Sequence, residues 1–203
     1  MKLYDGGRAP NPRRVRIFLA EKGIEIPMVQ IDLGALQQKS PEISALNPLM
    51  RVPILEFDDG SALCETVAIC RYFEEIQPDP PLMGLDARDR ADVEMWNRRM
   101  ELNLSAAIAA VARHGNKAMA VLEPVQVPEW AEFNRQRIPD ILKWLDGALA
   151  GRDYIAGPRY TIADITALCA LDFMKVTKIP MGEENVNLLR WHRTVSERPS
   201  ARA

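Results

Sequence analysis

Residues 51–75, RVPILEFDDGSALCETVAICRYFEE, contain the signals that decide the fold of this chain. Val52 to Phe57 and Ser61 to Leu63 are short apolar runs on either side of Asp58-Asp59-Gly60, a combination typical of a β-hairpin. From Thr66 to Ile76 the apolar residues recur at helical spacing. The stretch therefore predicts two antiparallel strands followed directly by a helix.

The residues before this stretch alternate between strand and helix patterns. Lys2 to Asp5 and Ile24 to Leu33 are predicted strands, because each is a short run with apolar members. Pro12 to Lys22 is a predicted helix that ends at Gly23, and Pro41 to Leu46 is a shorter one. The order β-α-β-α-β-β-α predicts a small α/β domain over residues 1–80.

A proline-rich connector follows this domain. Gln77-Pro78-Asp79-Pro80-Pro81 cannot continue a helix and favours an extended chain, so we expect the domain boundary here. Every long segment beyond it has helical periodicity, which predicts an all-helical second domain over residues 86–203. The predicted helices of this domain are 86–114, 129–149, 161–176 and 184–196.

Composition and charge argue against several function classes. The formal net charge of the 203 residues is −2, without the basic excess expected of a nucleic-acid-binding protein. No apolar run approaches the roughly 18 residues of a membrane span, and the first residues lack the apolar stretch of a signal peptide. We therefore expect a cytoplasmic protein that binds neither nucleic acid nor a membrane.

The cysteine and histidine content predicts no metal site. The three cysteines, Cys64, Cys70 and Cys169, lack metal-ligand spacing, and the chain has only two histidines. Buried free cysteines in a reducing compartment are the expectation.

Three short features of the first domain have the chemistry of a binding site. Asn11-Pro12 suits a helix start, where free N–H groups and a partial positive charge favour an anion such as a thiolate. Pro53 could form a cis bond after Val52, which leaves the Val52 backbone free for an extended ligand. Glu65-Thr66 offers a carboxylate for an ammonium group, and a hydroxyl with helix-start amides for a carboxylate.

Each feature also has a purely structural interpretation. Asn11 and Thr66 could merely cap their helices, and Pro53 could merely begin a strand. The ordered set is more informative than any single feature. It resembles the glutathione transferase family, whose N-terminal domain is thioredoxin-like. The matching segments are Tyr4-Asp5, NPRRVRIFLAEKG (11–23), SPEISALNPLMRVPILEFDDG (40–60), LCETVAICRYFEE (63–75) and YTIADITALCAL (160–171).

The resemblance implies a role for each matching residue. Glu65 and Thr66 are placed like the residues that bind the γ-glutamyl head group of glutathione. Val52, followed by a cis Pro53, is placed like the residue whose backbone pairs with the cysteinyl unit. Lys39, with help from Gln38, is placed like residues that hold the glycine carboxylate.

The sequence departs from many members of the family at the position that faces the thiol of glutathione. Where these have Tyr or Ser near the end of the first strand, this chain has Gly6-Gly7. Asn11 is then the candidate catalytic residue, with Tyr4 less favoured because strand alternation points it into the core. Backbone amides at the start of the helix remain an alternative to the Asn11 side chain.

For the rest of the function the resemblance implies a detoxifying transferase that conjugates glutathione to a small hydrophobic electrophile. Glutathione serves as co-substrate without a further cofactor, and a homodimer is typical. The expected electrophile site is a face of the first long helix of the second domain, formed by Met100, Asn103, Leu104 and Ala107. Glutathione-dependent disulfide or peroxide reduction, and non-catalytic glutathione binding, remain alternatives. Dithiol exchange by the protein itself is not expected, because no Cys-x-x-Cys opens the first helix.

A second helix-start signal lies in the later domain. Thr161-Ile162-Ala163-Asp164 has the spacing of a capping box, in which the first side chain caps the helix and the fourth reciprocates. We expect a structural role for Thr161 and Asp164.

Overall fold

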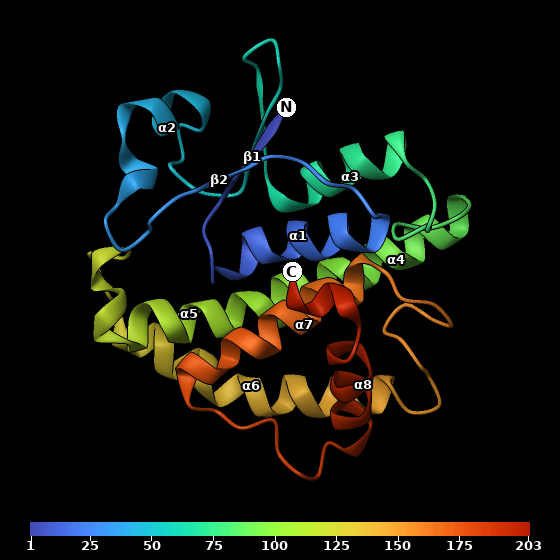
Figure 1. The fold of residues 1–203 in the computed structure, drawn as a ribbon. Coiled ribbons are helices and arrows are strands. Elements are labelled where there is room, and N and C mark those ends of the chain that lie inside the picture. The colour runs from blue at the N-terminus through green and yellow to red at the C-terminus, as the bar shows by residue number, and fades with distance from the viewer. The chain divides into compact units, whose positions relative to one another are not determined.

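The computed structural model describes residues 1–203 and divides them into two compact units. Met1–Pro80 and Arg202–Ala203 form the first unit, and Pro81–Ala201 form the second. The first unit is an α/β domain and the second contains only helices (Figure 1). Both expected classes, thioredoxin-like and all-helical, are confirmed.

A four-stranded sheet forms the centre of the first unit. Its strands are β1 (Lys2–Asp5), β2 (Met28–Gln30), β3 (Ile54–Glu56) and β4 (Ala62–Cys64). They lie in the order β2-β1-β3-β4, with β1 parallel to β2 and the other pairs antiparallel. The predicted hairpin of β3 and β4 is confirmed. The predicted strand over residues 24–33 shrinks to three residues, because Pro27 has no N–H to donate to a sheet.

Three helices pack on this sheet. They are α1 (Pro10–Lys22), α2 (Pro41–Leu46) and α3 (Thr66–Ile76), with a short 3₁₀ turn, η1 (Gln37–Lys39), before α2. Figure 1 shows α1 and α3 side by side at one face of the sheet and α2 away from them. Ile43 of α2 packs with Tyr4 and Ile54, which define the other face. The sheet is therefore covered on both sides.

Lys22, near the end of α1, fastens the proline-rich connector to the first unit. Its Nζ lies 2.6 Å from a carboxylate oxygen of Glu74 and donates to the carbonyls of Gln77 (2.8 Å), Pro78 (3.1 Å) and Pro80 (2.6 Å). Only 3% of Lys22 is exposed. A buried ammonium is tolerated here because a carboxylate and three carbonyl oxygens surround it.

The second unit is built from long helices. They are α4 (Ala87–Arg99), α5 (Ala106–Gly115), α6 (Pro128–Ala148), α7 (Ile162–Met174) and α8 (Val186–Ser196), with the short 3₁₀ segments η3 (Lys117–Val121), η4 (Lys175–Thr177) and η5 (Pro199–Arg202). The predicted helix over residues 86–114 is continuous but changes its winding. A π-helical segment, η2 (Met100–Ser105), joins α4 to α5.

The start of α7 is held by a buried capping box. The backbone N–H of Thr161 donates to Asp164 Oδ2 (2.9 Å), and the two residues cap each other reciprocally, which confirms the predicted motif. Asp164 Oδ1 also accepts from the N–H of Ile155 (2.9 Å) and from Trp191 Nε1 (2.8 Å). Complete burial raises the pKa of Asp164 to about 6, although these donors act against the shift.

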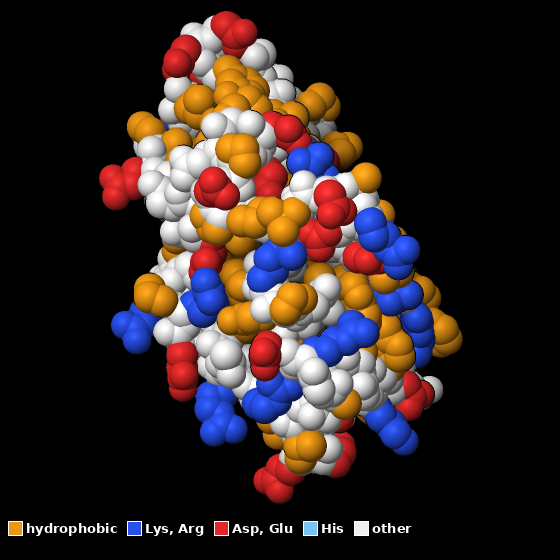
Figure 2. Space-filling view, turned by 90° about the vertical axis from the view of Figure 1, so that its right-hand side faces the viewer, with side chains coloured by type: hydrophobic (Ala, Val, Ile, Leu, Met, Phe, Trp, Pro, Cys, Tyr) orange, Lys and Arg blue, Asp and Glu red, His pale blue; other side chains and the backbone are white.

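The surface has no basic face on the side drawn in Figure 2, where Lys and Arg side chains alternate with acidic and hydrophobic ones. None of the helices is long and apolar enough to cross a bilayer.

Candidate active site

The register of the sheet brings the three binding-site features of the first unit to one edge. Tyr4 of β1 pairs with Ile54 of β3, and Ile54 pairs in turn with Cys64 of β4. Next to these three paired residues, the chain passes from β1 to Gly6. Val52-Pro53 leads into β3, and β4 is followed by Glu65-Thr66. Segments up to 60 residues apart in sequence thus meet at the same edge.

Gly6 lies directly against Val52 in this arrangement. A Cβ atom on Gly6 would be 2.9 Å from Cγ2 of Val52, closer than real Cβ atoms come to a neighbour, and 3.2 Å from Cδ1 of Leu33, tighter than most real Cβ contacts. Gly7 follows with a φ of 59°, a conformation that favours glycine. The two glycines that replace the usual Tyr or Ser are therefore required by packing and by the turn.

Asp5 and Arg16 fix the turn between β1 and α1. The Asp5 carboxylate is buried, forms an ion pair with Arg16 of α1, and accepts from the N–H of Gly7 (2.9 Å). One carboxylate thus ties the end of the strand, the turn and the helix together. Sequence analysis did not single out this pair, because an acid and a base eleven positions apart form no local pattern.

The Val52–Pro53 bond is cis, as predicted. Val52 is buried, but its backbone N–H and C=O form no hydrogen bond within the chain. A buried N–H and C=O of this kind normally find partners. Val52 therefore offers one donor and one acceptor to an extended ligand.

Glu65 is exposed and has an unusual backbone conformation. Its φ is 72°, a value that non-glycine residues rarely adopt and that concentrates at functional sites. Glu65 is the N-cap of α3, and Thr66, only 6% exposed, is the first residue of the helix. The alternative that Thr66 caps α3 is therefore wrong, and the hydroxyl stands beside the free amides of the first turn.

The expectation that Asn11 caps α1 is also wrong. The N-cap is Ala9, and α1 begins at Pro10, because proline already has the φ of a helix and lacks only an N–H that would be unpaired there. Asn11 is thus the second residue of the helix, with an exposed side chain. Since Pro10 and Pro12 have no N–H and the N–H of Arg13 donates to Ala9 O (3.3 Å), Asn11 supplies the free amide of this turn.

The remaining residue expected near the ligand lies on η1. Lys39 is exposed at the end of this turn, so its ammonium group is available to a carboxylate. Gln38 beside it is buried, and its Oε1 has no hydrogen-bond partner.

The four residues expected to hold an electrophile do not form one face. Met100, Leu104 and Ala107 are at most 2% exposed, whereas Asn103 is exposed. The physical reason is their helical spacing, which turns 100, 104 and 107 together into the core and leaves 103 outside. The structure therefore separates Asn103 from the other three residues, and the electrophile site itself stays a prediction.

Comparison with known proteins agrees with this geometry. The glutathione S-transferase N-terminal domain family matches residues 9–76, and its C-terminal domain family matches residues 106–199. Glutathione S-transferase 2 of Saccharomyces cerevisiae is 33% identical, over 100% of this chain and 88% of the relative. This chain belongs to the glutathione S-transferase family.

Solved structures agree as well. A glutathione S-transferase domain-containing protein of Marinobacter aquaeolei has a TM-score of 0.95 and 35% identity, covering 98% of this chain and 99% of that chain. Gtt2 of Saccharomyces cerevisiae has a TM-score of 0.94 and 33% identity, covering 100% and 99%. The expected family and enzyme class, a glutathione transferase, are confirmed.

Proposed function

We propose that this glutathione S-transferase conjugates the thiolate of glutathione to a small hydrophobic electrophile. The observation that carries the proposal is that Val52 and the starts of α1 and α3, with Asn11 and Glu65-Thr66, lie at one edge of the sheet, each with unused hydrogen-bonding groups. Glutathione is an extended peptide with an ammonium group, two carboxylates and a thiol. The first unit presents a partner for each of these groups: a carboxylate for the ammonium, a hydroxyl, amides and a lysine for the carboxylates, a free backbone for the peptide, and Asn11 for the thiol.

The proposed pose follows from the chemistry of each residue. Glu65 accepts from the ammonium of the γ-glutamyl group, while Thr66 and the amides of α3 bind its carboxylate. The free N–H and C=O of Val52 pair with the cysteinyl backbone, as two strands would, beside the cis Pro53. Lys39 pairs with the glycine carboxylate as a point charge.

Catalysis in this proposal consists of holding the thiolate. A free thiol with a pKa near 8.5 is about 3% ionised at pH 7, and a fall of two units makes it mostly thiolate, at a differential stabilisation of about 2.7 kcal/mol. Hydrogen bonds from the Asn11 side chain and backbone N–H, together with the partial positive charge at the start of α1, can supply a stabilisation of this size. The proton of the thiol passes to water, so no general base is required. The stabilised anion then forms a carbon–sulfur bond to the electrophile while a halide leaves or an epoxide C–O bond breaks.

The proposal places the enzyme in the cytoplasm, as a homodimer that removes reactive compounds. Calorimetric titration with glutathione tests the binding site, and 1:1 binding per chain at physiological glutathione is expected. A panel of halogenated aromatics, epoxides, peroxides and mixed disulfides then separates conjugation from reduction. Turnover confined to peroxides or disulfides would contradict conjugation, and absence of glutathione binding would contradict the whole site. Sedimentation analysis tests the homodimer.

A further inference from the structure

A buried ion pair links the end of β1 to the second turn of α1. Asp5, the last residue of β1, is 1% exposed, and its Oδ1 pairs with Nη1 of Arg16. Arg16 also donates from Nη2 to the backbone oxygen of Ala203 (3.4 Å), a contact that is exposed to water. Asp5 is therefore the buried partner of this guanidinium, and Arg16 is the cation that neutralises Asp5.

The same carboxylate holds the turn that leads to the proposed thiol site. Asp5 Oδ2 accepts from the N–H of Gly7 (2.9 Å), and the N–H of Ala9 donates to the carbonyl of Gly6 (3.2 Å). Ala9 is the N-cap of α1, and Asn11 with its free amide follows two residues later. The buried charge of Asp5 and the proposed partner of the sulfur are therefore separated by this one turn of the chain.

The other charges in the loops at this edge of the sheet are in contact with water. Every one of them is exposed: Arg8, Asp32, Lys39, Arg51 and Glu65. On α1, Arg13 and Arg14 have interaction partners of their own. Exposed charges interact weakly because water and salt screen them, whereas buried charges are screened much less. The ionisation of a thiol at this edge should therefore be most sensitive to the balance between Asp5 and Arg16.

An unpaired carboxylate at Asp5 would oppose ionisation of the thiol. A nearby negative charge raises the pKa of a group that becomes an anion, because like charges repel. The Gly7 N–H binds the carboxylate but leaves its full charge in place. Only the guanidinium of Arg16 cancels that charge.

We propose that Arg16 is a positioning residue for the thiolate, which acts through Asp5 by neutralising its carboxylate. Arg16 touches neither glutathione nor the electrophile in this proposal. The inference rests on the proposed place of the thiol beside Asn11. If the pair were only structural, loss of either partner would loosen the turn and raise the pKa of the thiol. If the pair acts through charge, the two single substitutions shift this pKa in opposite directions.

The experiment measures the pKa of the bound glutathione thiol from thiolate absorbance against pH, in the full-length protein. Arg16→Gln leaves the Asp5 charge unpaired and should raise this pKa by about one unit. Asp5→Asn leaves the Arg16 charge unpaired and should lower it, since the introduced amide keeps an oxygen for the Gly7 N–H. The double variant Asp5→Asn/Arg16→Gln removes both charges and should return the pKa to the parental value.

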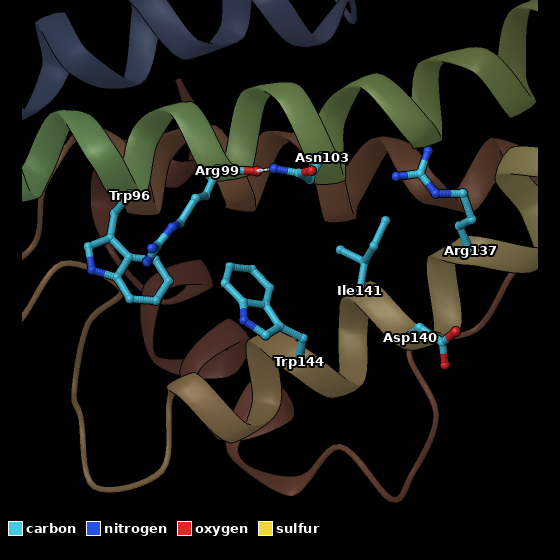
Figure 3. Close-up of a pocket in the computed structure, with 7 residues that line it drawn as sticks. All are labelled: Trp96, Arg99, Asn103, Arg137, Asp140, Ile141 and Trp144. Carbon is cyan, nitrogen blue, oxygen red and sulfur yellow. Dashed lines mark hydrogen bonds between the residues drawn. The ribbon is translucent and has the colours of Figure 1, made fainter.

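Two control variants separate this effect from changes in net charge and in stability. Arg137→Gln removes a positive charge from α6 of the helical unit, where Figure 3 shows the side chain at the end of the cleft away from Trp96. Glu74→Gln breaks the buried pair with Lys22 at the other end of α1 and should lower stability. Both should leave the pKa of the bound thiol unchanged. Binding of S-methylglutathione to Arg16→Gln should barely change, because this ligand has no thiolate.

The possible outcomes separate the charge effect from a structural one. Circular dichroism and denaturant unfolding establish that each variant is folded. A double variant no closer to the parent than Arg16→Gln, or an Asp5→Asn variant whose thiol pKa does not fall, would overturn the inference. The second result is decisive even where Arg16→Gln does not fold. A parent protein that does not bind glutathione would overturn the proposed function as well, whereas an unchanged pKa in Arg16→Gln, on a parent that binds, would overturn this inference alone.

Discussion

Gly6 and Val52 pack against each other so closely that a single methyl group on Gly6 would lie 2.9 Å from Cγ2 of Val52. This contact joins the turn that leads to Asn11 with the segment that presents the free backbone of Val52. A displacement of Gly6 would therefore affect both Asn11, the proposed partner of the glutathione thiolate, and Val52, the proposed partner of the cysteinyl backbone.

Gly6→Ala should displace Val52 and raise the dissociation constant for glutathione about tenfold, because overpacking of this kind is relieved by movement of the neighbouring backbone. Val52→Ala in the same chain removes the clashing methyl and should restore most of the affinity. Gly147→Ala, where an added Cβ meets nothing within 4 Å, is the control. Calorimetry measures all three, and an unaffected Gly6→Ala variant would show that the contact is not tight.

Glu65→Ala and Thr66→Ala should each weaken glutathione binding by about 1–3 kcal/mol, because a charged head group loses a charge-assisted partner. Glu75→Ala changes an exposed carboxylate on the same helix and should have no effect. The dissociation constants come from calorimetric titration. If both site variants bind like the parent, the head group does not lie at the start of α3.

Asn11→Ala should raise the pKa of the bound glutathione thiol, read from thiolate absorbance against pH, and lower the rate at neutral pH. Binding of S-methylglutathione, which has no thiolate to stabilise, should barely change. Because Asn11 is not the cap of α1, the variant should keep its thermal stability. An unchanged pKa and rate would transfer the role from the side chain to the backbone N–H of Asn11, which alanine retains.

The free energy of unfolding should contain a pH-dependent contribution from Asp164. The pKa of this group rises on folding from 3.8 to about 6, so the folded state binds the proton more tightly. Stability should therefore fall as the pH rises from about 4 to 6, by up to about 3 kcal/mol. Urea titrations of the parent and Asp164→Asn should differ in this window. Parallel pH profiles of the two proteins would contradict the shift.

Thr161→Ala should destabilise the protein by about 0.5–2 kcal/mol through loss of the α7 cap, with glutathione affinity unchanged. Denaturant unfolding and calorimetry measure the two quantities. Loss of glutathione binding in a fully folded Thr161→Ala variant would argue for a role beyond capping.

Local sequence signals predicted most of the fold. The hairpin around Asp58-Asp59-Gly60, the helix at Thr66 and the capping box at Thr161 depend on residues within a few positions of one another, so periodicity and turn chemistry are sufficient. The same local rules failed at the start of α1. Pro10 and Asn11 both suit a helix start, and the structure has the earlier one, with Ala9 as the N-cap.

The candidate site was predicted residue by residue from a resemblance, but its geometry was not. The left-handed backbone of Glu65, the contact of Gly6 with Val52 and the free backbone of Val52 each depend on pairing between strands far apart in sequence.

The sequence by itself determined which segments form helices and strands, and which residue types are available to bind a peptide thiol. These properties follow from short-range sterics, backbone hydrogen bonding and the period of apolar residues. Only the tertiary structure decided which of those residues meet: the register Tyr4–Ile54–Cys64 sets the site at one edge of the sheet, and helix packing turns Met100 inward and Asn103 outward. Such contacts depend on packing between segments far apart in the chain, and no short stretch of sequence contains the information that predicts it.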